Sequence, residues 1–198
     1  MHMDIAAVTE ITGQQYQDPA DFKCVEKSPV GDAVLSPYNM NYPSVDMRHI
    51  FCGQIVHHEA QGFHSLNPST DWTKCAYADN CNFFPDQNGY CRNVLIRTHD
   101  SSFEFKISGS SMWPSKLTPV QLVPLFQYLY SSCQPATINA DLCFPRCYWL
   151  GFNNDEFDIV IIARGHTIVT AYPAQKGTCS RSNSMNICSS QPCQRMHP

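Results

Sequence analysis

Residues 48–65 have the sequence RHIFCGQIVHHEAQGFHS. Two histidines in this stretch, His49 and His64, lie fifteen residues apart. A short apolar run follows the first, and Gly62 precedes the second by two residues. The pattern predicts a strand from His49 onward, a reversal at residues 57–59 and a return that brings His64 near His49. Two neighbouring imidazoles suit general acid and base catalysis near neutral pH, although most histidines in proteins are ordinary surface or half-buried residues.

The length is enough for one substantial domain or two small ones, and since the sequence shows no true domain linker we expect one. The chain has 198 residues, of which 43% are hydrophobic and only 15% charged, and the low charge argues against disorder and against a coiled coil. No apolar run approaches the length of about 18 residues that a transmembrane helix needs, so we expect no membrane partner. The net charge of -4 excludes a globally basic surface, so a nucleic acid would be held by a local patch.

Eleven cysteines indicate an oxidised, secreted protein with several disulfides. Because the number is odd, at least one thiol is expected to be free or to pair with another chain. Cys52 lies within the predicted strand and is the candidate for a buried thiol. The expected pairs fall in three groups: among Cys75, Cys81 and Cys91; between Cys143 and Cys147 or their neighbours; and among Cys179, Cys188 and Cys193.

Two hairpins are predicted downstream. The first joins residues 91–98 to 103–107, where apolar residues alternate with Glu104 and Lys106, so that Lys106 should point away from the apolar face and be solvated. The second joins residues 158–163 to 166–172 through Arg164 and Gly165.

One helix is predicted to begin at Pro119, with Thr118 as its N-cap. Its apolar residues at positions 122, 125, 126 and 129 define one buried face. The segments 24–47, 65–90 and 134–157 are rich in glycine, proline and asparagine and are expected to be loops.

Four short motifs follow one another between residues 47 and 173. They are His49-Ile50-Phe51-Cys52-Gly53, Gly62-Phe63-His64, Lys106-Ile107-Ser108-Gly109-Ser110-Ser111 and Thr170-Ala171-Tyr172. In this order and spacing they resemble the EndoU family of endoribonucleases, which includes animal poly(U)-specific enzymes, nidoviral uridylate-specific enzymes and bacterial contact-dependent toxins. The chain departs from the family at Gln54, because a glutamate or aspartate often follows the motif glycine there.

The resemblance implies an α+β fold with two lobes, built from antiparallel sheets with helices outside them and a groove between the lobes. Residues 1–198 would form a single catalytic domain of this kind. The motif-bearing core would span residues 47–173, and residues 174–198 would form a tail rich in cysteine and serine.

The resemblance also implies an activity, which is cleavage of single-stranded or loop RNA at uridylates. The 2′-hydroxyl would attack the adjacent phosphodiester and leave a 2′,3′-cyclic phosphate, so DNA, which lacks this nucleophile, would not be a substrate. Following the family, His64 would be the general base and His49 the general acid, and Lys106 would stabilise the charge of the transition state.

Three further residues are expected to bind the substrate. Tyr172 would stack on the ribose and base, and Thr170 and Ser110 would hydrogen-bond the edge of a pyrimidine, which the resemblance makes uracil. No metal is expected to be required, since the sequence shows no carboxylate cluster, although manganese stimulates some family members. An inhibitor or immunity protein would be a further partner if the chain acts as a secreted toxin or effector.

Two other functions are compatible with the sequence. One is a zinc-binding protein, given eight histidines and eleven cysteines, but the chain contains no Cys-x2-Cys pair. The other is a non-catalytic, disulfide-rich module that binds RNA or a protein partner without cutting it. A metal assay tests the first alternative, and a cleavage assay tests the second.

Overall fold

The fold is described from a computed structural model of the 198-residue chain. The described residues are 15–26, 33–37, 42–83, 89–98, 100–133, 141–147, 157–174 and 186–187, with backbone alone at 83, 132–133, 141–147, 157 and 186–187. The architecture is mixed α+β and is dominated by sheets with few helices, which confirms the predicted class. No helix in this described part of the chain is long and apolar enough to cross a membrane.

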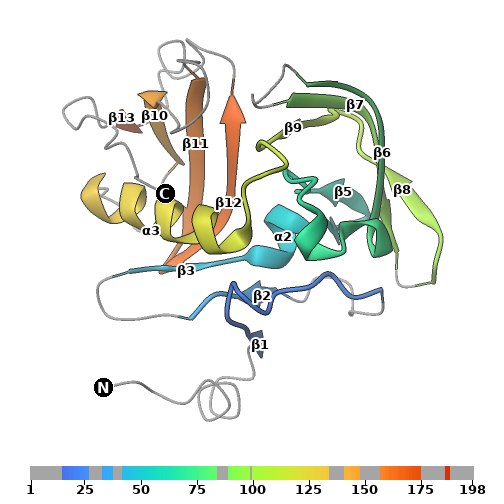
Figure 1. The fold of residues 1–198 in the computed structure, drawn as a ribbon, viewed down its shortest axis with the longest axis horizontal. Coiled ribbons are helices and arrows are strands. Elements are labelled where there is room, and N and C mark those ends of the chain that lie inside the picture. Colours follow the sequence, from blue (N-terminus) through green and yellow to red (C-terminus); the bar gives the residue numbers. More distant parts are fainter. Residues whose placement is uncertain are drawn as a thin grey trace.

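The larger sheet has five strands in the order β13-β10-β11-β12-β3 (Figure 1). Its three central strands are antiparallel, and the strands at both ends run parallel to their neighbours. The strands are β3 (Ser44–Val45), β10 (Asp141–Cys147), β11 (Phe157–Arg164), β12 (Thr167–Ala174) and β13 (Asn186–Ile187). The β11–β12 pair is the second predicted hairpin, which is therefore confirmed.

The smaller sheet is antiparallel and has β7 (Gly89–Arg97) at its centre. Its other strands, β6 (Ala76–Phe83), β8 (Phe103–Phe105) and β9 (Ser110–Met112), all pair directly with β7. The β7–β8 pair confirms the first predicted hairpin.

The remaining elements are short, except for one helix of 15 residues. A two-residue turn with positive φ at His57 and His58 joins β4 (Gln54–Val56) to β5 (Glu59–Gln61). This turn is the chain reversal that was predicted at residues 57–59. In Figure 1, α2 (Met47–Phe51) and β5 lie between the larger sheet and strands β6–β7 of the smaller one. The others are β1 (Gln15–Tyr16), β2 (Val34–Leu35), η1 (Pro68–Thr70) and η2 (Trp72–Lys74).

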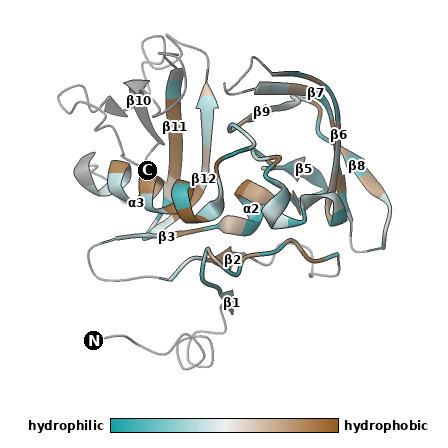
Figure 2. Cartoon of the chain, viewed as in Figure 1, coloured by the Kyte–Doolittle hydropathy of each residue, from teal (hydrophilic) through white to brown (hydrophobic). Residues whose placement is uncertain are grey.

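Each sheet has a hydrophobic cluster of its own. The larger cluster joins α2, β11 and β12 to α3 (Pro119–Cys133), whose predicted apolar face is buried. Figure 2 shows hydrophobic residues in brown on α2, α3 and β11. Burial of such side chains contributes about 1.5–3 kcal/mol each. The smaller cluster lies between β4 and the β6–β7–β9 sheet and includes Phe63 and Ile96. The helix begins at Pro119 as predicted, and it continues through Pro124.

The strand predicted from His49 onward is wrong in its first half. Residues 47–51 form the short helix α2, because the Asp46 side chain caps it by accepting the backbone N–H of His49. All five helical residues are buried, so the segment has no polar face whose period could have indicated a helix. Only residues 54–56 are extended.

All three segments predicted as loops contain strands. Residues 65–90 include both 3-10 helices and all of β6, whose Asp79, Asn80 and Asn82 are unusual in strands. Pairing with β7 along its length overrides this local preference. Residues 134–157 include β10, in which Pro145 lies at a shift in register against β11, where a missing N–H donor is tolerated. The 24–47 segment likewise contains β2 and β3.

The expectation that Lys106 is solvated is also wrong. Lys106 is only 8% exposed, whereas Phe103, Phe105 and Ile107 are 41%, 50% and 90% exposed. Glu104 is exposed as well, so burial does not alternate along β8 as predicted; the lysine is inside and the apolar residues are outside, the inverse of the prediction. Burying an ammonium group is costly unless it is hydrogen-bonded, so this inversion points to a specific role for Lys106.

Two disulfides occur among the described cysteines. Cys81–Cys91 joins β6 to β7 and lies within a predicted group. Cys52 was expected to be a free thiol, but it pairs with Cys24, and the free buried thiol is Cys75. The expectation failed because spacing in sequence does not show which sulfurs meet in space. The remaining expected pairs lie outside the described side chains: Cys143, Cys147, Cys179, Cys188 and Cys193.

Candidate functional site

His49 lies on α2 and is 6% exposed. Its ring Nδ1 is 3.3 Å from Gln54 Oε1, and Gln54 Nε2 donates to Asp46 Oδ2 at 3.4 Å. Since the Gln54 amide nitrogen faces Asp46, its oxygen faces the imidazole and accepts the Nδ1–H of His49. This arrangement leaves Nε2 of His49 for chemistry.

His64 is held against α2 by backbone hydrogen bonds. Its N–H donates to Ile50 O at 2.6 Å, and the preceding Phe63 N–H donates to His49 O at 2.8 Å. Gly62 (φ 73°) makes this approach possible, because a Cβ there would lie 2.0 Å from His49 O and 2.8 Å from His49 Cδ2. The two histidines are thus brought together, as residues 48–65 predicted.

The tautomer of His64 follows from its partners. Nδ1 lies 2.8 Å from Ser111 O and 3.1 Å from Ser110 Oγ. A carbonyl oxygen only accepts, so Nδ1 carries the proton and Nε2 carries the lone pair. The His64 ring also stacks on the Tyr172 ring, with centroids 5.1 Å apart and an interplanar angle of 22°.

Lys106 reaches the same place from the end of β8. Its Nζ donates to Gly62 O at 2.6 Å and to Ser110 Oγ at 2.9 Å. Ser110 also donates to Phe63 O and is 2% exposed. Gly62 therefore lies against the His49 backbone and also accepts a hydrogen bond from Lys106. Ser110 connects Lys106 with His64, because its hydroxyl is within hydrogen-bond distance of both.

Thr170 and Tyr172 are on β12, two residues apart, and both pair across to β11. Trp113 ties this strand to the histidine segment, because its backbone N–H donates to His64 O at 2.7 Å and its indole N–H to Ala171 O at 3.0 Å. Thr170 is 7% exposed, and its Oγ1 makes no hydrogen bond to any described residue.

Burial controls the charges of the site. It lowers the pKa of His49 to about 4, assisted by the positive charge of Lys106 and opposed by the hydrogen bond to Gln54. Burial, Lys106 and His49 also hold the pKa of His64 well below its usual value, against the effect of the hydrogen bond to Ser111. Burial lowers the pKa of Lys106 to about 8. At neutral pH both imidazoles are therefore neutral and the lysine is mostly protonated.

Asp46 and Gln54 are functional candidates that sequence reasoning did not select. Burial raises the pKa of Asp46 to about 6, against the effect of its hydrogen bonds to His49 and Gln54. An aspartate is a preferred N-cap residue, so Asp46 would have stood out had residues 47–51 been predicted as a helix. Gln54 stood out only as a departure from the family motif.

The donor set around His49 does not suit a manganese ion. The nearby carboxylate, Asp46, already accepts from His49 N and from Gln54 Nε2, and both residues are buried. In the described part of the chain, the one group of three or more side chains placed to ligate a metal is Cys24, Cys52 and Cys75. We therefore derive no catalytic step through a metal.

Comparisons of the chain with protein-family models, with curated proteins and with solved structures found no match. The EndoU resemblance accordingly rests on the four motifs and their order. The arrangement of the site residues is independent of that resemblance, because it comes from the contacts given above.

Proposed function

We propose that this chain is an endoribonuclease that cleaves RNA at uridylates, using the 2′-hydroxyl as nucleophile and leaving a 2′,3′-cyclic phosphate. The observation that supports the proposal is the gathering of His49, His64 and Lys106 around Gly62. Two imidazoles and one cation are a sufficient set for this reaction, since it needs a base, an acid and a group that stabilises the charge of the phosphorane.

His64 is the proposed base. Its Nδ1–H is held by Ser111 O, so Nε2 carries the lone pair that would accept the proton of the 2′-hydroxyl. Because its pKa is held well below the usual value, the base form persists into the acidic range.

His49 is the proposed acid, which would protonate the departing 5′-oxygen from Nε2. In the free protein its pKa of about 4 leaves the ring mainly neutral at pH 7. A bound phosphodiester raises this pKa, because a nearby negative charge favours the imidazolium form. Substrate binding would thus generate the acid at the position where it is needed.

Lys106 would stabilise the developing negative charge on the phosphoryl group. Two of the three N–H groups of its ammonium are bound by Gly62 O and Ser110 Oγ, and the third is available to a non-bridging oxygen. Removal of such a contact typically lowers the rate about 100- to 1,000-fold. Ser110 is buried and contacts Lys106 and His64, so we assign it a positioning role beside the predicted contact to the base.

Thr170 and Tyr172 would select the nucleotide. The Thr170 hydroxyl makes no hydrogen bond to any described residue and can donate to or accept from the edge of uracil. Tyr172 would stack on the nucleotide beside His64. We also propose that the fold has two lobes with a groove between them that binds single-stranded RNA. The protein would be secreted and act as a toxin or effector, with an inhibitor or immunity protein as its partner.

A cleavage assay with chelator present tests the proposal. A short RNA with one uridine should be cut to a cyclic phosphate, and the analogue with a 2′-deoxyuridine at that position should survive. His49→Ala and His64→Ala should each reduce cleavage at least 1,000-fold, by analogy with other catalytic histidines. His166→Ala is the matched control, because His166 is exposed in the β11–β12 turn, and it should cut normally.

Two results would refute the proposal. Cleavage of the deoxy analogue would exclude the 2′-hydroxyl mechanism, and full activity of His64→Ala would remove that residue from the chemistry. Tight RNA binding without cleavage at any pH would instead support the non-catalytic binding module.

A further inference from the structure

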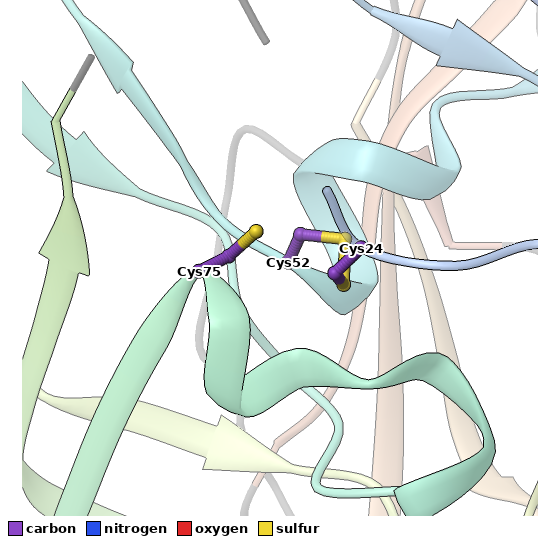
Figure 3. Close-up of side chains that lie close together, drawn as sticks. All are labelled: Cys24, Cys52 and Cys75. Carbon is purple, nitrogen blue, oxygen red and sulfur yellow. A yellow bond between two sulfur atoms is a disulfide. The ribbon is translucent and has the colours of Figure 1, made fainter. Parts of the chain in front are cut away.

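Three cysteine sulfurs, none of them from a proposed site residue, meet at the C-terminal end of α2. Cys24 comes from the N-terminal segment, Cys52 is the C-cap of α2, and Cys75 is the C-cap of η2. All three are buried, and their sulfur atoms lie within 4.8 Å of one another. Figure 3 shows the Cys75 sulfur on the side that faces the Cys24–Cys52 disulfide.

We propose that these three cysteines form a thiol–disulfide exchange site, in which the Cys75 thiol attacks the Cys24–Cys52 disulfide and the chain interconverts between two pairings. A free thiol beside a disulfide is the arrangement that this reaction requires. The inference goes beyond the proposed ribonuclease activity and does not depend on it.

The exchange is balanced without any external oxidant or reductant. Cys75 loses its proton, and its thiolate attacks Cys52 Sγ, so a Cys52–Cys75 bond forms while the Cys24–Cys52 bond breaks. Cys24 leaves as a thiolate and takes up a proton. Attack on Cys24 Sγ instead gives a Cys24–Cys75 bond and frees Cys52. Each reaction conserves one disulfide and one thiol.

The surroundings of Cys75 limit the rate of this exchange. Burial raises the pKa of its thiol, and Glu26 acts in the same direction, whereas Arg48, Arg97 and Lys74 lower it. The thiol also donates to Val25 O at 3.2 Å. Because only the thiolate attacks, exchange should be slow near neutral pH and faster as the pH rises.

Exchange at Cys52 would change how the N-terminal segment is attached. The disulfide spans 28 residues and is the covalent link between Cys24 and α2. Other contacts remain after exchange, since Cys24 N donates to Thr70 O at 2.7 Å and the Phe22 and Phe51 rings lie 5.8 Å apart. The segment would then be held by non-covalent contacts alone.

The test maps the free thiol in the full chain. Protein free of reductant is incubated at pH 6 or pH 8.5, acidified to stop exchange, and denatured with excess N-ethylmaleimide. It is then digested without reduction and analysed by mass spectrometry. We expect the label on Cys75 to be accompanied by label on Cys24 or Cys52, and this fraction should grow faster at pH 8.5. Label confined to Cys75 after prolonged incubation at pH 8.5 would overturn the proposal.

Two variants sharpen this result. Cys75→Ser removes the nucleophile, so no label should appear on Cys24 or Cys52 under any condition. Cys24→Ser leaves Cys52 and Cys75 as two thiols. When oxidised glutathione is added and takes up their two electrons, a peptide cross-linked through Cys52 and Cys75 is expected. Its absence, in protein whose near-ultraviolet circular dichroism matches the unsubstituted chain, would show that these sulfurs do not reach each other. Neither measurement depends on RNA cleavage, so this test remains valid even if the chain has no ribonuclease activity.

Discussion

Gln54 hydrogen-bonds the His49 ring and opposes the effect of burial on the pKa of His49. Its amide oxygen accepts the Nδ1–H of His49, and its amide nitrogen donates to Asp46. An amide orients the imidazole as a carboxylate would, but it supplies no negative charge. The low pKa of His49 therefore reflects burial that a neutral partner only partly offsets.

Gln54→Glu should raise the pKa of His49 by about one unit or more, because a carboxylate beside Nδ1–H stabilises the imidazolium. The measurement is an NMR titration of the His49 ring. Gln54→Leu is the control, since it removes the hydrogen bond without adding charge, and it should not raise this pKa. An unchanged His49 pKa in Gln54→Glu would show that Gln54 does not contact the ring in solution.

The pH dependence of cleavage follows from the same pKa values. His49 must be protonated and His64 neutral, and the His49 pKa is about 4. The active fraction of the free protein, and with it kcat/KM, should therefore fall roughly tenfold per pH unit between pH 5 and 8. The fall should steepen above pH 8, where Lys106 loses its proton. A profile that rises through this range would contradict the assignment of His49 as the acid.

At the scale of elements, the link from β5 to His64 positions the site. Gly62 and Phe63 both have positive φ, at 73° and 61°, and Phe63 is fully buried. Left-handed backbone at a non-glycine residue costs about 1–2 kcal/mol. The link is maintained by contacts on both sides, because Phe63 N donates to His49 O and Lys106 Nζ donates to Gly62 O.

Gly62→Ala should destabilise the fold by about 2 kcal/mol or more and abolish cleavage, because the new Cβ would displace the His49 backbone. Chemical denaturation and the cleavage assay measure the two effects. Gly165→Ala is the matched control, since its φ is also positive but nothing lies within 4 Å of its Cβ. Equal effects of the two substitutions would show that close approach to His49 is not the reason for Gly62.

For the whole molecule, the buried site makes stability depend on pH. His49 and His64 have lowered pKa values, so the unfolded chain binds more protons than the folded chain between about pH 4 and 6.5. Their contribution to stability is complete above pH 6.5 and is lost as the pH falls through the folded-state pKa. Asp46 acts in the opposite sense, because its raised pKa makes the folded state the better proton binder up to about pH 6.

The free energy of unfolding should therefore rise by on the order of 2 kcal/mol from pH 4 to pH 6.5, since two histidines outweigh one carboxylate. Urea unfolding at several pH values measures this change. Asp46→Asn keeps a good N-cap residue and removes the opposing effect, so its dependence should be steeper. A stability that falls with pH over this range would show that the histidines are not buried in the folded state.

The sequence predicted correctly those features of the fold that depend on interactions between residues close together in the chain. Alternation and turn residues predicted both hairpins, proline and threonine predicted the start of α3, and two histidines with an intervening turn predicted their approach. In each case the signal comes from backbone preference or from the period of side chains, both of which act within a few residues.

Tertiary structure decided the rest. Asp79 and Asn82 are in strand β6 because β7 pairs with them, and Lys106 is inside because Gly62 O and Ser110 Oγ bind its ammonium. The pairing of Cys24 with Cys52, and the free thiol of Cys75 beside them, likewise depend on which segments meet. The sequence determined the elements and the chemical groups they carry. Which groups face one another depends on contacts between distant residues, and no local pattern encodes those contacts.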